Sequence, residues 1–166
     1  MESLAWLHHE LGELSSARDL RVTVLEKYQI LQGEDDPRTL QAMDHLGNTH
    51  RALGQNKEAQ EMLELVLEKQ RKVIGENHPE TARTLSSLAL TYQHLGQLNK
   101  AQELAMSAVE IYTQLLGEDH PQTVWSMDIL ANIYCELGQF TEADHQYHIV
   151  VDKSIRILGE NHPNTL

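Results

Sequence analysis

The sequence contains a single cysteine, Cys135, among its 166 residues. One thiol excludes an internal disulfide and is typical of a reducing compartment, so we expect a cytoplasmic protein. No apolar run approaches the roughly 18 residues of a membrane-spanning helix, and the first residues do not resemble a signal peptide. The sequence therefore gives no indication of secretion or of membrane insertion.

Basic residues are also scarce. The chain has 13 Lys and Arg against 25 Asp and Glu, and a formal net charge of −12. Nucleic-acid binding requires clustered Lys and Arg to neutralise phosphates, so this composition argues against a nucleic-acid partner. An acidic surface of this kind more often serves solubility than recognition.

The four prolines all lie in one recurring motif. Pro37, Pro79, Pro121 and Pro163 follow one another at a constant spacing of 42 residues. Each stands in a Gly-Glu-(Asp/Asn)-(Asp/His)-Pro-x-Thr segment, and these segments are Gly33–Leu40, Gly75–Ala82, Gly117–Val124 and Gly159–Leu166. A second mark has the same period: Leu11-Gly12, Leu53-Gly54, Leu95-Gly96 and Leu137-Gly138. A strict period in this range predicts a stacked repeat array, in which each unit contacts only its neighbours.

Each period has the pattern of two helices. Pro79 suits the first position of a helix, and Gly96 supplies the left-handed residue that commonly ends one. Between them apolar residues recur at spacings of three and four: Leu85, Leu88, Ala89, Tyr92 and Leu95. A second helix is expected to start from Asn99, as an N-cap with Gln102 three residues later, and to stop before Gly117. In the same register stand Ser15, Thr141 and the poorer cap Lys57. We expect helices of roughly 16 and 17 residues.

Small residues recur where the two helices of a hairpin should approach each other. They are Ala5, Gly47, Ala89 and Ala131 on the first helices, and Ala17, Ala59, Ala101 and Ala143 on the second. A glycine within a helix costs about 1 kcal/mol relative to alanine, so Gly47 indicates a position where bulk is excluded.

Together these residues resemble a known family. A small residue, Tyr92 or Tyr134, the Leu-Gly pair and then Ala101 or Ala143 resemble the tetratricopeptide repeat (TPR). That repeat usually has about 34 residues, and the 42-residue period with its Asn-His-Pro loop is similar to the kinesin-light-chain variety. The resemblance covers essentially the whole chain. It departs at three positions, where His8 and His50 replace the tyrosine and Asp36 replaces the loop histidine.

The resemblance implies an all-α fold: a right-handed superhelical solenoid of tandem antiparallel helix hairpins. We expect a single array over residues 1–166, with a partial unit at about 1–36, complete units at 37–78, 79–120 and 121–162, and the start of a fifth at 163–166. No unit has the polar outer face of a terminal cap. We therefore expect a fragment of a longer array, and end-to-end self-association of such a fragment.

Two groups of histidines raise the question of a metal or an active site. His78, His120 and His162 stand one repeat apart, too far to share one ion, so we expect each to help start its helix by capping or packing. His145 and His148, with Asp144 and Asp152, could chelate a metal weakly, but a solvated helix face explains them better. The sequence has no phosphate-binding loop and no acid pair set apart from the surface charge. We therefore predict a protein that is not an enzyme and that has no cofactor and no metal.

The first helices remain as the candidate binding face. In proteins of this resemblance they line a concave groove that binds peptides. The repeat register gives four rows of groove candidates: Gln41, Arg83 and Trp125; Glu2, Asp44, Ser86 and Asp128; Trp6, Asn48, Leu90 and Asn132; His9, Arg51, Gln93 and Cys135. The asparagines could pair with a peptide backbone, and the tryptophans are the kind of residue that often dominates binding energy. The acidic row favours a ligand with basic residues and disfavours a C-terminal carboxylate.

The function implied is a protein–protein interaction module that binds a peptide or partner surface. Two narrower alternatives stay open: a cargo adaptor of kinesin-light-chain type, or the TPR sensor or scaffold of a larger signalling NTPase. A third is an enzyme whose catalytic part lies outside this segment. Flanking sequence would separate them, since heptads indicate the adaptor and a phosphate-binding loop the NTPase.

Overall fold

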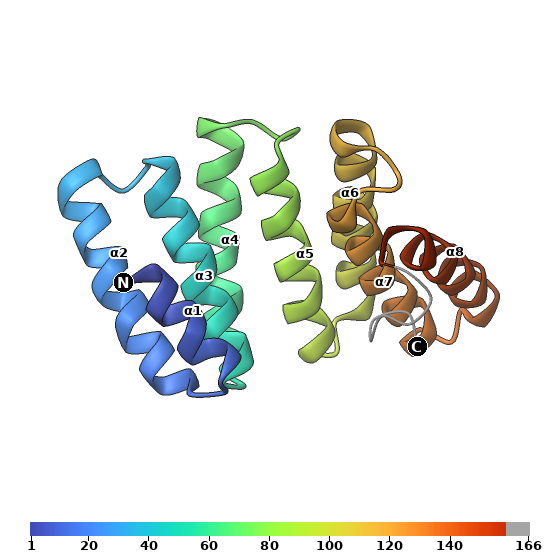
Figure 1. Ribbon diagram of the computed structural model, residues 1–166, viewed down its shortest axis with the longest axis horizontal. Helices are drawn as coiled ribbons and strands as arrows, with labels where there is room; N and C mark the ends of the chain where they lie inside the picture. The colour runs from blue at the N-terminus through green and yellow to red at the C-terminus, as the bar shows by residue number, and fades with distance from the viewer. Residues whose placement is uncertain (159–166) are drawn as a thin grey trace. The chain divides into compact units, whose positions relative to one another are not determined.

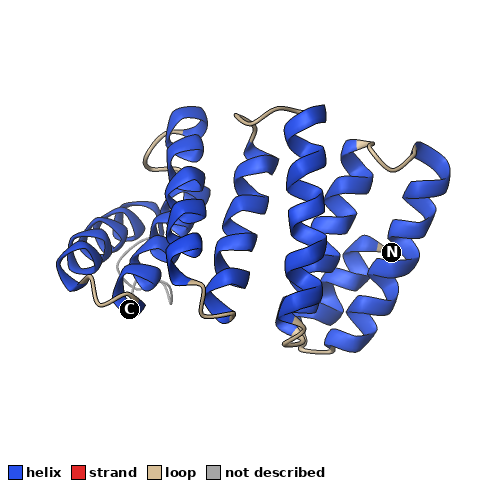
Figure 2. Cartoon of the chain, turned by 180° about the vertical axis from the view of Figure 1, so that it is seen from behind, coloured by secondary structure: helices blue, strands red, loops and turns tan. Residues whose placement is uncertain are grey.

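The structure, a computed structural model, describes residues 1–158. Within this range the regular secondary structure is entirely helical (Figure 2). The helices are α1 (Glu2–Glu10), α2 (Leu14–Gln32), α3 (Pro37–Ala52), α4 (Asn56–Val73), α5 (Pro79–His94), α6 (Leu98–Leu116), α7 (Pro121–Glu136) and α8 (Phe140–Leu158). The all-α prediction is confirmed. None of the helices in the described part is long and apolar enough to cross a membrane.

Contacts between the helices divide the chain into two compact units at Glu76. Unit 1 contains α1 to α4, and unit 2, which begins at Asn77, contains α5 to α8. Within each unit, consecutive helices run antiparallel and pack against each other, with short turns between them (Figure 1). The predicted arrangement of tandem hairpins is therefore present in both units.

The first helices of three hairpins begin at the repeated prolines, as predicted. The residue before each proline caps the helix through its side chain. Asp36 accepts a hydrogen bond from the backbone N–H of Arg38 at 2.8 Å. His78 Nδ1 accepts one from Glu80 at 3.1 Å, and His120 Nδ1 accepts one from Gln122 at 3.2 Å. The capping role expected for these histidines is confirmed, and aspartate serves the same purpose where it replaces histidine. His162 lies outside the described residues.

The second helices begin differently from the prediction. Asn99, Thr141, Ser15 and Lys57 are not N-caps, because each already lies inside its helix. In α6, for example, Gln97 is the N-cap and makes no side-chain capping bond. The reason lies in the turn before it. Gln97 N–H is already bonded to the carbonyl of Tyr92 at 2.9 Å, so the ending of α5 leads directly into α6.

Glycines give these turns and loops their geometry. Gly54 has φ +77°, and the next residue, Gln55, donates its N–H to His50 O at 2.9 Å, which is the bond that closes a Schellman turn. Gly33 has φ +94° and ψ 169°, a region that essentially only glycine occupies. Thr39 Oγ1 then donates to the carbonyl of Gly33 at 2.8 Å, and Thr123 repeats this bond with Gly117 at 2.8 Å. These bonds explain the glycine and threonine of the repeated motif.

The small residues lie in the core between paired helices, as predicted. All eight are buried, including Ala17, Ala59 and Ala101 on the second helices. A Cβ added at Gly47 would lie 2.8 Å from Leu63 Cγ, closer than side-chain atoms normally approach. Bulk is therefore excluded at Gly47 by direct contact between α3 and α4.

Candidate partner-binding face

The candidate binding residues lie on the first helix of each hairpin: α1 and α3 in unit 1, α5 and α7 in unit 2. The structure places Glu2, Trp6 and His9 on α1; Gln41, Asp44, Asn48 and Arg51 on α3; Arg83, Ser86, Leu90 and Gln93 on α5; Trp125, Asp128, Asn132 and Cys135 on α7. The face of each compact unit is described by itself.

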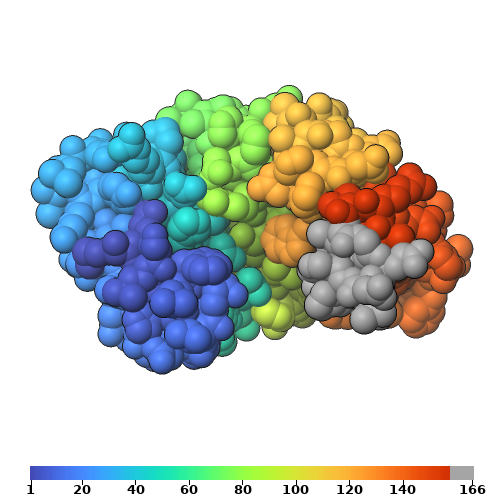
Figure 3. Space-filling view, viewed as in Figure 1, coloured from blue at the N-terminus to red at the C-terminus, as the bar shows by residue number. Residues whose placement is uncertain are grey.

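In unit 1, α1 carries an accessible aromatic member of the set. Trp6 is 60% exposed, and α1 appears in dark blue at the surface in Figure 3. A cavity of about 340 Å³ lies beside it, and its lining includes Glu2, Trp6, Arg21 and His45. An aromatic side chain next to unfilled space is a site where a partner can dock.

Asp44 does not fit the predicted role, because it is completely buried. A carboxylate without solvent access does not offer a contact to a ligand, so the interpretation of Asp44 as a contact for basic ligands is wrong. Its charge acts within the fold instead. Desolvation by burial lowers the pKa of both Arg21 and Arg51, and the negative charge of Asp44 opposes that shift in each case.

Arg21 is a residue that the sequence analysis did not single out. It lies on α2 at the repeat position that holds Leu63 on α4, Ala105 on α6 and Tyr147 on α8. Its Nη1 donates to the backbone carbonyl of His45 at 2.6 Å and also contacts Thr49 Oγ1. A charged residue at a position that is otherwise apolar or aromatic was a visible signal in the repeat register.

The two asparagines predicted to pair with a peptide backbone make hydrogen bonds within the fold. Asn48 Nδ2 donates to the carbonyl and carboxylate of Asp44 at 3.0 and 3.2 Å. Asn132 Nδ2 makes the same pair of bonds to Asp128 at 2.8 and 3.4 Å, while its Oδ1 accepts from Tyr147 OH at 2.9 Å. A ligand that used these amides would compete with bonds already formed.

In unit 2, most candidate residues of α5 are buried or already paired within the fold. Ser86 is buried and donates to the carbonyl of Ala82 at 3.1 Å, which removes it from the accessible face. Gln93 Nε2 donates to Glu136 on α7 at 2.6 Å, and Arg83 pairs with Glu80 at 2.5 Å. Leu90 is partly buried, so α5 presents a largely satisfied surface.

One open part of unit 2 lies on α7 and α8. A cleft of about 560 Å³ is lined there by Pro121, Val124, Trp125, Asp128, Val150, Ser154 and Ile157. Trp125 is 46% exposed, and Cys135 is also exposed further along α7. Burial raises the pKa of Asp128, and the hydrogen bond from Asn132 acts in the opposite direction.

The two histidines considered as metal ligands lie on α8. His148 is mostly exposed, and its Nε2 stands 3.8 Å from Asp144 Oδ1. Across the described residues no cluster of three or more His, Cys, Asp or Glu side chains has a metal-binding arrangement.

These features define a class: an all-α repeat protein built of tandem helix hairpins. The tetratricopeptide repeat model matches residues 1–72, 46–114 and 80–148, so the chain belongs to the tetratricopeptide repeat family. No curated protein matches.

Solved structures agree with this assignment. Two structures of a protein from Podosopora anserina, named as a kinesin light chain with nearly identical TPR-like repeats, are 29% and 30% identical to this chain. Both matches cover 99% of this chain and 77% or 78% of the other, with TM-scores of 0.83 and 0.82. The repeats are thus of the kinesin-light-chain-like type. A Rap protein complexed with competence and sporulation factor shares the fold at 16% identity and a TM-score of 0.80, over 92% of this chain and 41% of that one.

Proposed function

We propose that this chain is a non-catalytic protein-interaction module that binds a peptide or partner surface on its first-helix faces. The observation that carries the proposal is the pair of accessible tryptophans beside unfilled space. Trp6 lies at the cavity of unit 1, and Trp125 lies at the cleft of unit 2. Large aromatic side chains are held exposed at a cost in solubility, and they commonly anchor partners.

Membership of the TPR family supports the same role. The Rap structure holds competence and sporulation factor, so a related helical array is known to receive a ligand. The resemblance to a kinesin-light-chain protein favours a cargo-adaptor role over the TPR part of a signalling NTPase. The single cysteine is consistent with a cytoplasmic setting.

The test is selection from a random peptide display library on the immobilised chain. Selected peptides should lose at least about tenfold in affinity on Trp6→Ala or Trp125→Ala, as expected for an aromatic anchor. Two matched controls truncate exposed apolar residues of the second helices: Ile30→Ala on α2, which is 83% exposed, and Met106→Ala on α6. These should leave affinity unchanged. If the controls abolish binding and the tryptophan variants do not, the binding face is wrongly assigned.

A further inference from the structure

The cleft of unit 2 contains a carboxylate with no cation beside it. Asp128 lines the cleft, and the hydrogen bonds it accepts come from Asn132. No Lys or Arg is among the described residues that line this space. The nearest lysine along α8, Lys153, is held elsewhere, because its Nζ lies 2.6 Å from Asp119 and 3.4 Å from Glu118. The cleft therefore has a negative charge that the fold does not neutralise.

Neighbouring charges reinforce this sign. Burial raises the pKa of the Tyr147 phenol, and the negative charges of Asp128 and Glu136 raise it further. Tyr147 OH donates a hydrogen bond to Asn132, which in turn donates one to Asp128, so the phenol is connected to the carboxylate of the cleft through one side chain.

The other members of the row show that this situation is particular to Asp128. Glu2 is exposed, and Ser86 is uncharged. Asp44 is buried, and its charge acts on Arg21 and Arg51 within unit 1. A partly buried carboxylate without a compensating cation costs stability, and it is retained most readily where a ligand supplies the missing charge.

The rest of the lining fits the shape of a basic side chain. Trp125 stands three residues before Asp128, lines the same cleft and is half-exposed, so its ring is accessible to a cation. Val124, Val150 and Ile157 form an apolar wall suited to the methylene stem of lysine or arginine.

We propose that this cleft binds a lysine or arginine side chain of the partner, with the charged head at Asp128 and the stem against Trp125 and the apolar wall. This rests on the proposed function and deepens it, since it names the group that the partner presents to unit 2. Hydrogen bonds between charged groups are worth roughly twice neutral ones, so the charge should account for about a tenfold preference.

The experiment uses the whole chain and four pools of end-capped, fluorescent peptides that differ only in one fixed central residue: lysine, arginine, norleucine or glutamate. Fluorescence anisotropy should show the lysine and arginine pools binding about tenfold more tightly than the norleucine pool, with the glutamate pool weakest. The preference should decrease as salt is added, because a partly exposed ion pair is screened.

Asp128→Asn keeps the shape of the side chain and should abolish the preference, whereas Asp144→Asn, on the exposed face of α8, should preserve it. Equal binding of the norleucine and lysine pools to the wild type would mean that an apolar segment docks in the cleft, and would overturn the proposal without any variant. Retention of the preference by a folded Asp128→Asn protein would also overturn it. If Trp125→Ala weakens all pools while Asp128→Asn changes nothing, the binding face stands and only the cation site fails. If no pool binds, both proposals fail.

Discussion

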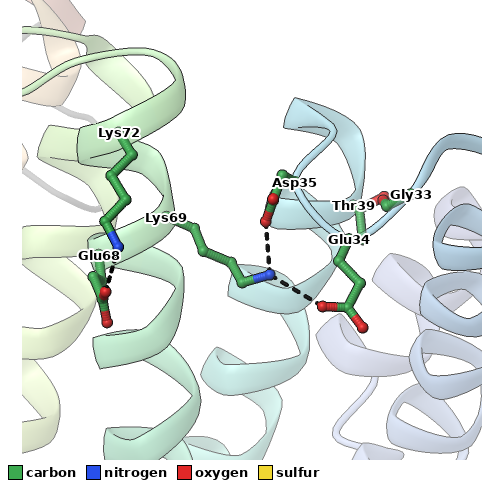
Figure 4. A network of polar contacts seen from close by, with 7 residues as sticks. All are labelled: Gly33, Glu34, Asp35, Thr39, Glu68, Lys69 and Lys72. Carbon is green, nitrogen blue, oxygen red and sulfur yellow. Dashed lines mark hydrogen bonds and ion pairs between the residues drawn. The ribbon is translucent and has the colours of Figure 1, made fainter.

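Lys69 Nζ lies 2.7 Å from Asp35 Oδ1, so the second helix of a hairpin holds the loop that precedes the same hairpin (Figure 4). The same ammonium group is 3.3 Å from Glu34, which gives the loop two contacts with α4. Unit 2 has the same arrangement two repeats later: Lys153 of α8 contacts Asp119 at 2.6 Å and Glu118 at 3.4 Å. In both units, therefore, the lysine and the acidic pair together attach the loop to the second helix.

The loop between α4 and α5, which has a different residue pair, supports this interpretation. The position equivalent to Lys69 and Lys153 is Ile111, which is buried on α6. The loop position equivalent to Asp35 and Asp119 is there the uncharged Asn77. Where the lysine is absent, the aspartate is absent as well, as expected if each is retained for the other.

The first prediction concerns Lys153→Met. It should lower the Tm by no more than a few degrees, because pairs at the surface contribute little. The effect should depend on pH. The hydrogen bond and charge of Lys153 hold the pKa of Asp119 below its usual range. A carboxyl with a lowered folded pKa stabilises the fold above its unfolded pKa, about 3.9, and loses that contribution as the pH falls through the folded value.

The difference in Tm between wild type and Lys153→Met should therefore be present at neutral pH and vanish in strong acid. Lys72→Met is the matched control, since Lys72 pairs with Glu68 at 2.6 Å on the exposed face of a single helix and holds no loop. A control effect as large as that of Lys153→Met would contradict a special role for the loop contact. Thermal unfolding followed by circular dichroism measures all three proteins.

Much of the fold follows from local chemistry that the sequence displays. Pro79 fixes a helix start, Gly54 and its equivalents fix helix ends, and Ala101 marks a close approach, so these features are predictable from residue type and period. The start of α6 was misplaced at Asn99 because backbone bonds of the preceding turn, rather than a side chain, begin that helix. A capping motif can occur within a helix without capping it.

The binding face was less predictable, because accessibility depends on contacts between helices. Register alone placed Asp44 and Asp128 in one row, yet one is buried and the other lines a cleft. Likewise, the hydrogen bond from Tyr147 to Asn132 joins residues on different helices, so a local sequence pattern does not predict it. The period determines which residues are equivalent, whereas the neighbouring side chains determine what each can do.

The second prediction tests the histidine caps. His120→Ala removes the acceptor for the N–H of Gln122 and should destabilise the chain by about 1 kcal/mol. His120→Asp should retain or increase stability, because Asp36 already caps α3 in this way and a negative charge is favourable at a helix N-terminus. Urea unfolding of the two variants measures the difference. Equal loss in both would show that the ring packs rather than caps, and His148→Ala provides an exposed control.

The third prediction concerns the stability of the cleft itself. Burial raises the pKa of Asp128, so its ionised form is disfavoured in the fold. Because the folded pKa lies above the unfolded one, this carboxyl destabilises the fold at neutral pH. That penalty decreases as the pH falls through the folded value and is gone below the unfolded pKa, about 3.9. Asp128→Asn should therefore raise the Tm at pH 7, and the gain should disappear in acid. A lower Tm at pH 7 would contradict an unneutralised carboxylate at this position.

The fourth prediction concerns the contact between α3 and α4. Gly47→Ala should gain up to about 1 kcal/mol from helix propensity. However, its Cβ would lie 2.8 Å from Leu63 Cγ, and Leu63 is completely buried. Overpacking of this kind costs about 1–3 kcal/mol, so the net result should be destabilisation. Leu63→Ala alone should cost about 2–5 kcal/mol by leaving a cavity.

The double variant distinguishes the clash from any other effect of losing the glycine. In a Leu63→Ala background the obstructing atoms are gone, so Gly47→Ala should reverse sign and become stabilising. Urea unfolding of the wild type, both single variants and the double variant completes the cycle. Additive changes would show that the two positions do not touch. A reversed sign would establish that Gly47 is kept because Leu63 fills the space where its side chain would be.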